Sequence, residues 1–283
     1  MAHGVVVVGV DGSPKDERSI TWAAQAATDR GAQLRIVYGF TFVGAAYGYG
    51  LPPIDVEEIS ATITEPLAQR ARELQPNLTV TTSGIAGDPA VALVTLSREA
   101  DLLVVGARGL GRLASRILGS VSQKVAAQAH CPVTVVRADS PAPRGPVTVG
   151  VDPADIIPEV IEFGFAEAGH RGLGVRLLSA FSPAADEIGD AQVQRLLGHA
   201  AQERSKEMDA LGEQWQARYP DVPAEVTVLH TDPVDALAAG AEEAAMLVLG
   251  SRGRRGLTGR RLGSVAQGVL HVAPLVTVLP IQA

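Results

Sequence analysis

Two segments of the chain share a glycine spacing that suits phosphate binding. Residues 106–120 and 250–264 both read Gly-x-x-Gly, nine residues, then Gly-Ser. The first glycine ends an apolar run, and the lack of a Cβ there lets a ribose or phosphate contact the backbone. Each Gly-Ser pair opens a helical pattern, and the free N–H groups and positive dipole end of a helix attract an anion. Both segments are therefore candidate phosphate loops.

The residues inside these segments are basic. Residues 107–118 hold three arginines and no acid, and residues 251–262 hold five arginines and no acid, in a chain whose net charge is -7. Guanidinium groups concentrated in this way favour a polyphosphate ligand.

A carboxylate follows the first apolar run of each half of the chain. Asp11 and Asp152 are placed like the acid that accepts from a ribose hydroxyl in other doubly wound folds. Gly9 and Gly150 precede them by two residues and leave room for a base or sugar against the strand. These side chains predict the ribose end of a nucleotide site.

Each feature also has a purely structural interpretation. A loop glycine commonly makes only a turn, a serine at a helix start commonly caps the helix, and a surface arginine is commonly solvated. Asp11 in the sequence DGSP reads equally well as the cap of the next helix. The recurrence of all the features together in both halves favours nucleotide binding.

The elements that position these residues come from an internal duplication. Three blocks recur in the same order: 5–13 as 146–154, 34–40 as 175–181, and 87–109 as 231–253. The offset is 141 residues for the first two blocks and 144 for the third. We expect a first domain at 1–140, a proline-rich linker at 141–146 and a second domain at 147–283.

Short apolar runs alternate with helical spacing in each copy. The predicted strands of the first copy are 5–10, 34–38, 78–83, 101–105 and 133–137, and those matched in the second are 175–179, 225–229, 245–249 and 275–279. Strands separated by helices predict an α/β fold of two tandem doubly wound domains, each a five-stranded parallel sheet flanked by about four helices. Ligands of such sheets lie beyond the carboxyl ends of the strands, where the strand order reverses.

Composition excludes several classes of protein. Hydrophobic residues make up 46% of the chain and charged residues 19%, and no apolar run approaches the roughly 18 residues of a membrane helix. The start lacks a basic flank, and Cys131 is the one cysteine, so we expect a cytoplasmic protein without disulfides. The spacing of the histidines argues against a zinc site, and the negative net charge argues against binding to nucleic acid. We find no catalytic residues, because no nucleophile, general base or Walker lysine is evident.

These residues resemble a known family. VVVVGVDGS and VTVGVD at the first strands, the repeated glycine motif, and HCPVTVV and VAPLVTVL near the last strands are similar to tandem-domain universal stress proteins of the ATP-binding, actinobacterial type. The resemblance implies ATP at the carboxyl edge of each sheet, with Mg²⁺ or Mn²⁺ beside the triphosphate. It also implies a dimer of chains, and the apolar edge strands suit such pairing.

The resemblance assigns binding roles residue by residue. In the first copy, the resemblance assigns the ribose and base side to Gly9 and Asp11, and the adenine edge to Gly39. It assigns the ribose and phosphates to Gly106, Arg108, Gly109, Gly111 and Arg112, and the phosphates to Gly119, Ser120 and Val121. The matching positions of the second copy are Gly150, Asp152, Ala180, Gly250, Arg252, Gly253, Arg255, Gly256, Gly263, Ser264 and Val265. Gly12-Ser13 becomes Pro153-Ala154 in the second copy, which makes that site slightly degenerate.

The sequence leaves three functions open. The first is a regulatory ATP-binding protein of the stress response, in which the nucleotide switches a conformation or an association with a protein partner of unknown identity. The second is a slow ATPase or a phosphoryl- or nucleotidyl-transfer enzyme that uses the same cradle. The third is an interaction module whose nucleotide is structural.

Overall fold

The computed structural model describes residues 4–40, 55–107, 118–137, 145–182, 191–252 and 262–281, with the side chains of residues 40 and 191–197 excepted. The chain divides into two compact units, Met1–Ser140 and Pro141–Ala283, here called unit 1 and unit 2. Each unit is an α/β domain, as the sequence predicts.

Unit 1 is built on a parallel sheet. Its strands are β1 (Val5–Val10), β2 (Gln33–Phe40), β3 (Val80–Ala86), β4 (Leu102–Gly106) and β5 (Val133–Val136), in the spatial order β3-β2-β1-β4-β5. The order reverses between β1 and β4, because β2 and β3 lie on one side of β1 and β4 and β5 on the other. That reversal is the place where doubly wound sheets bind ligands.

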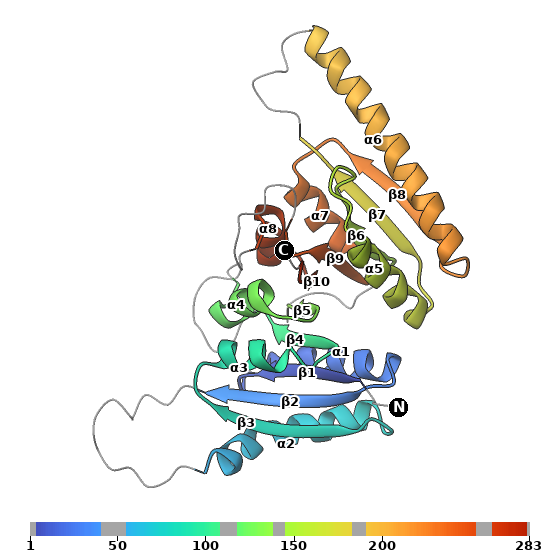
Figure 1. Ribbon diagram of the computed structural model, residues 1–283. Helices are drawn as coiled ribbons and strands as arrows, with labels where there is room; N and C mark the ends of the chain where they lie inside the picture. The colour runs from blue at the N-terminus through green and yellow to red at the C-terminus, as the bar shows by residue number, and fades with distance from the viewer. Residues whose placement is uncertain are drawn as a thin grey trace. The chain divides into compact units, whose positions relative to one another are not determined.

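The helices of unit 1 pack in two pairs. They are α1 (Asp16–Asp29), α2 (Val56–Leu74), α3 (Pro89–Leu96) and α4 (Ser120–Gln128). Helix α1 contacts α2, and α3 contacts α4, so each pair covers part of the sheet (Figure 1).

Unit 2 repeats this arrangement. Its strands are β6 (Val147–Gly150), β7 (Val175–Ala180), β8 (Ala224–Leu229), β9 (Met246–Gly250) and β10 (Leu275–Leu279), in the order β8-β7-β6-β9-β10. Its helices are α5 (Pro158–Arg171), α6 (Ala191–Arg218), α7 (Pro233–Glu242) and α8 (Ser264–Val272). Helix α7 contacts α8, as α3 contacts α4 in unit 1.

Burial explains which strands the sequence predicts well. Strand β1 matches the predicted range 5–10, because a strand covered on both faces reads as a continuous apolar run. Strand β3 begins two residues later than predicted, and most of its residues are exposed or half-buried. An edge strand of this kind carries a weak apolar signal, so its ends are harder to read from the sequence.

Glycines follow the first helix of each unit. Gly31 has φ +60 and Gly172 has φ +64, the left-handed conformation that glycine adopts without strain.

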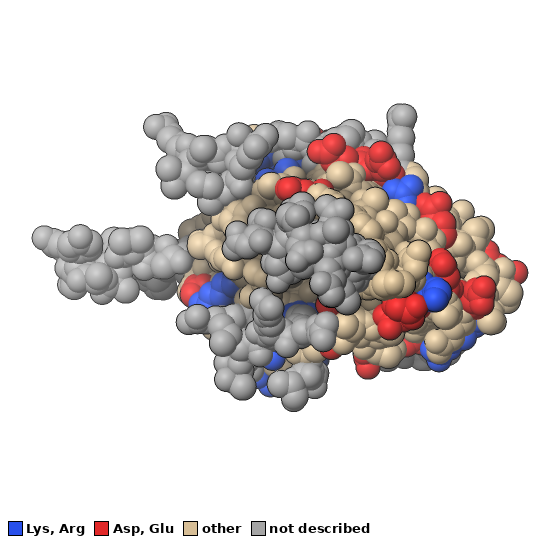
Figure 2. Space-filling view, turned by 90° about the horizontal axis from the view of Figure 1, so that it is seen from above, with Lys and Arg blue, Asp and Glu red and all other residues tan. Residues whose placement is uncertain are grey.

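On the face drawn in Figure 2, the described acidic and basic side chains are interspersed among neutral residues. No helix in the described ranges is long and apolar enough to cross a membrane.

Candidate functional site

Unit 1 has a cavity of about 480 Å³ at the point where its strand order reverses. The carboxyl ends of β1, β2 and β4 form its floor, and the first turns of α3 and α4 form its walls. The residues that line it are Gly9, Val10, Asp11, Asp16, Val37, Gly39, Pro89, Ala92, Leu93, Val105, Gly106, Leu118, Gly119, Ser120, Val121 and Ser122. The volume falls within the range of roughly 300–1,000 Å³ usual for small-molecule sites.

Helix α4 presents its first turn to this cavity. Its N-cap is Gly119, with φ -67 and ψ 150, and no side chain in the described ranges caps it. The N–H groups of Ser120, Val121 and Ser122 therefore have no partner within the helix. By contrast, Asp55 caps α2 through its carboxylate. Within the described residues, the start of α4 thus combines N–H donors that no side chain caps with the positive end of the helix dipole.

Two hydrogen bonds fix this first turn against the end of β4. The Gly119 N–H donates to the Ala107 carbonyl at 2.8 Å, and the Ser122 hydroxyl donates to the Gly106 carbonyl at 2.6 Å. Ser120, which the sequence suggests as a possible cap, is the first helical residue and is exposed. The sequence analysis missed Ser122, because a serine inside a helical pattern gives no signal of a bond to a strand.

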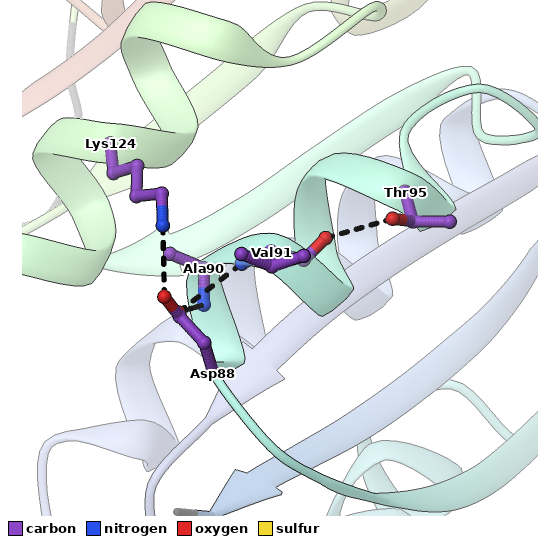
Figure 3. A network of polar contacts seen from close by, with 5 residues as sticks. All are labelled: Asp88, Ala90, Val91, Thr95 and Lys124. Atoms are coloured by element: carbon purple, nitrogen blue, oxygen red, sulfur yellow. Dashed lines mark hydrogen bonds and ion pairs between the residues drawn. The ribbon is translucent and has the colours of Figure 1, made fainter.

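Figure 3 shows the contacts that join the two helices at the cavity walls. Asp88 caps α3, because its Oδ1 accepts from the Ala90 N–H at 2.8 Å and the Val91 N–H at 3.3 Å. The Lys124 ammonium of α4 donates to the other oxygen of Asp88 at 2.8 Å. This hydrogen bond is the main reason that the pKa of Asp88 lies below its usual value. The ion pair holds α3 and α4 together beside the cavity.

Glycines in the strands serve the packing of helix α3. A Cβ on Gly9 would lie 2.7 Å from Leu93 Cδ1, and a Cβ on Gly39 would lie 2.8 Å from Pro89 Cβ. Gly9 lines the cavity, where the sequence places a base or sugar, and the Leu93 side chain also lies close to the Cα of this glycine. Any larger residue at position 9 would therefore displace Leu93.

Two carboxylates lie together on the ribose side predicted for unit 1. The Oδ2 atom of Asp16 accepts from the Asp11 N–H at 3.2 Å and the Gly12 N–H at 2.8 Å. Burial, and next the charge of Asp11, raise the pKa of Asp16 to about 6. Sequence reasoning missed Asp16, because an acid in the first turn of a helix is usually explained by the helix dipole.

Asp11 does not cap helix α1. Its Oδ1 accepts from the Ser13 N–H at 3.2 Å, and the N-cap of α1 is Lys15. Asp152 makes the same turn in unit 2, where its Oδ1 accepts from the Ala154 N–H at 3.2 Å. The capping interpretation of Asp11 is therefore wrong, and both carboxylates sit at the rim of a cavity instead.

The cavity of unit 2 is larger, about 980 Å³, and lies at the corresponding place. Helix α8 opens on it with Gly263 as N-cap (φ -64, ψ 156), again without a cap from any described side chain. The Gly263 N–H donates to the Ser251 carbonyl at 2.8 Å. The predicted positions among its lining residues are Gly150, Asp152, Ala180, Gly250, Arg252, Gly263, Ser264 and Val265, joined by Asp155, Ile157 and Arg204 among others.

The second cavity differs from the first at its carboxylate. Ile157 stands where unit 1 has Asp16, and Arg204 of α6 donates from Nη2 to Asp152 Oδ1 at 2.9 Å. Arg204 also donates from Nε to the Ser179 hydroxyl at 3.1 Å. Nothing in the sequence pairs Arg204 with Asp152, because the two are 52 residues apart and meet only through the packing of α6.

All the predicted site positions that the structure describes line one of the two cavities. The remaining predicted positions, Arg108, Gly109, Gly111, Arg112, Gly253, Arg255 and Gly256, lie outside the described residues. Cys131 is buried, and burial raises the pKa of its thiol to about 12, so the thiol is protonated at neutral pH and is a poor nucleophile.

Comparison with known proteins identifies the fold that carries these cavities. The universal stress protein family model matches residues 3–137 and again residues 143–279. The chain belongs to the universal stress protein family. The predicted resemblance to tandem-domain universal stress proteins is thus confirmed.

Relatives of similar length share both domains of this universal stress protein. Universal stress protein Rv2005c of Mycobacterium tuberculosis is 34% identical over 291 residues, which cover 96% of this chain and 94% of that protein. Rv2623 of the same species is 32% identical over 294 residues, which cover 95% and 93%. A universal stress protein from Archaeoglobus fulgidus has the same fold at 19% identity, with a TM-score of 0.68 and coverage of 98% and 96%.

Proposed function

We propose that each unit binds one nucleotide, ATP, with its phosphates at the first turn of α4 in unit 1 and of α8 in unit 2. The ribose would lie beside Asp11 or Asp152, and the adenine would lie toward Gly39 or Ala180. The protein would act as a regulatory stress-response protein, in which bound ATP shifts a conformation or an association between chains.

One observation carries this proposal. In both units, a glycine N-cap leaves the first-turn N–H groups of a helix directed at a cavity, at the reversal point of the sheet. Helices α3 and α7, which also begin at this edge, have their donors satisfied by Asp88 and Asp232. Donors left without a cap beside a cavity suit an anionic ligand such as a phosphate.

The residues present fit a triphosphate better than an isolated metal ion. No group of three or more histidine, cysteine or acidic side chains lies together in the described ranges. A Mg²⁺ or Mn²⁺ ion would therefore enter with the nucleotide, held largely by phosphate oxygens. When bound, such an ion would offset part of the phosphate charge near the helix start.

Native mass spectrometry with isothermal titration tests the proposal. We expect two ATP molecules per wild-type chain, one per chain in Gly119→Asp or Gly263→Asp, and none in the double variant. Aspartate is a good N-cap and suits the backbone angles of both positions, so the helix should persist while the carboxylate repels phosphate. Gly119→Ala is the matched control, because it adds a Cβ without charge.

Titration that detects no binding by the wild-type chain, at any ATP concentration up to the millimolar range, would refute the proposal. Equal binding by Gly119→Asp and Gly119→Ala would show that phosphate does not lie at α4. The same samples report the number of chains per particle and any release of ADP, so they also test the expected dimer and the slow-ATPase alternative.

A further inference from the structure

We propose that Arg204 makes the cavity of unit 2 insensitive to the ribose hydroxyls of its ligand, whereas the cavity of unit 1 selects a ribonucleotide. This inference rests on the proposed function and assigns a different ligand preference to each unit. It identifies Arg204 as the residue that determines the difference.

Arg204 is firmly held within the wall of the second cavity. Its Nη2 atom is 2.9 Å from Asp152 Oδ1, its Nε atom is 3.1 Å from Ser179 Oγ, and its guanidinium carbon is 5.1 Å from the centre of the Phe181 ring. The side chain is 19% exposed. An ion pair with additional partners on two sides is preorganised, since little side-chain freedom remains to be lost.

The ion pair occupies an acceptor oxygen of the carboxylate that a ribose hydroxyl would use. Asp152 Oδ1 already accepts from Arg204 and from the Ala154 N–H. A ribose hydroxyl must either displace a charge-assisted hydrogen bond or use a carboxylate whose charge the guanidinium balances. The guanidinium offsets part of the charge of this carboxylate, so a further hydroxyl donor gains less here than at a carboxylate without an adjacent cation.

Unit 1 has no arginine at the corresponding position of its second helix. The position that corresponds to Arg204, at the offset of 144 residues, is Ser60, a buried residue whose hydroxyl donates to the Glu57 carbonyl at 3.0 Å. Each cavity is lined by a second carboxyl group, Asp16 in unit 1 and Asp155 in unit 2, so Arg204 is the difference between them that bears on the first carboxylate. A carboxylate without such an arginine favours a ligand that donates hydrogen bonds, and ribose hydroxyls are such donors.

The two cavities can be compared in the full-length chain. Gly263→Asp leaves the unit 1 cavity available, and Gly119→Asp leaves the unit 2 cavity available. Isothermal titration then gives the Kd of each cavity for ATP, 2′-deoxy-ATP and 3′-deoxy-ATP. We expect at least one deoxynucleotide to bind unit 1 about tenfold more weakly than ATP, and all three to bind unit 2 within about twofold of one another.

Substitution of Arg204 supplies the second arm. In the Gly119→Asp chain, Arg204→Ser should raise the preference of unit 2 for ATP over the weaker deoxynucleotide to about tenfold, whereas Arg204→Lys should leave it near twofold. The inference is overturned if the two cavities show equal preference with Arg204 intact. It is also overturned if a folded Arg204→Ser chain keeps the preference unchanged. Binding of nucleotides without these differences would leave the proposed function standing, whereas no binding at all would overturn both.

Discussion

Replacing Asp16 by asparagine should stabilise unit 1 at neutral pH. The carboxylate of Asp16 is buried beside Asp11, and both effects disfavour its charged form. Asparagine keeps an oxygen that can accept from the Asp11 and Gly12 N–H groups but carries no charge. The substitution therefore removes an electrostatic cost while it retains the two hydrogen bonds that shape the turn.

The magnitude follows from the pKa of Asp16, which is about 6 in the folded protein against an ordinary 3.8. At about 1.4 kcal/mol for each pKa unit, ionisation of Asp16 costs unit 1 up to about 3 kcal/mol above pH 6. Because the raised pKa favours the protonated form, this cost is absent below pH 3.8 and grows as the pH rises toward 6. The pKa of about 6 already includes the stronger hydrogen bonds that the charged form accepts, so we expect a net gain of up to about 3 kcal/mol at neutral pH.

Guanidinium denaturation followed by tryptophan fluorescence measures this gain in one unit at a time. The chain has two tryptophans, and Trp22 lies in unit 1 while Trp215 lies in unit 2. In a Trp215→Phe background, the fluorescence reports on unit 1 alone. The Asp16→Asn chain and its parent are compared at about pH 4 and about pH 7.5, so that all other titrating groups cancel.

The pH dependence of the gain shows whether the removed charge or altered packing causes it. We expect the gain at pH 7.5 to shrink to a few tenths of a kcal/mol near pH 4, where Asp16 is protonated in the folded parent. A gain that is the same at both values of pH would refute the electrostatic argument. A loss of stability at pH 7.5 would show that the backbone turn needs the second carboxylate oxygen more than it suffers from the charge.

Three further predictions concern packing, a thiol and a helix cap. Gly150→Ala should destabilise unit 2 by about 2 kcal/mol in denaturant titrations, because the added Cβ would overlap leucine side chains. The control Gly198→Ala, on an exposed helix face, should be neutral or stabilising. Cys131 should react with a thiol reagent only as fast as the chain opens, and rapid modification of the native protein would contradict its buried, raised-pKa state. Asp88→Ala should lower the free energy of unfolding by about 1 kcal/mol, because it removes a helix cap, and Lys124→Ala should lower it by less, because it removes only an exposed ion pair. Equal losses of stability in the two variants would argue that the ion pair dominates.

The sequence predicts the sheets well because their central strands are buried on both faces. Strand β1 is a run of valines interrupted by one glycine, and such a run leaves little choice of structure. The helix start that opens on each cavity was also predictable, because the glycine spacing recurs in both halves. Duplication gives two independent readings of the same fold.

The polar details of the two cavities could not be predicted in the same way. Asp16 is important because of a raised pKa, which depends on burial that no local pattern reveals. The partner of Asp152 comes from α6, and only the register of that helix against β7 brings Arg204 within reach. The close approach of Leu93 to Gly9 could not be predicted either, because the packing of α3 on the strand is a tertiary contact.

Positions 60 and 204 lie within helices, and a helix keeps its backbone whichever of these two side chains it carries. A gene that has doubled in length can therefore alter the chemistry of one half by a single codon replacement, with the sheet and the helix starts left intact. One half can then keep its binding chemistry while the other half changes. Tandem fusion thus keeps both versions at equal abundance in one polypeptide.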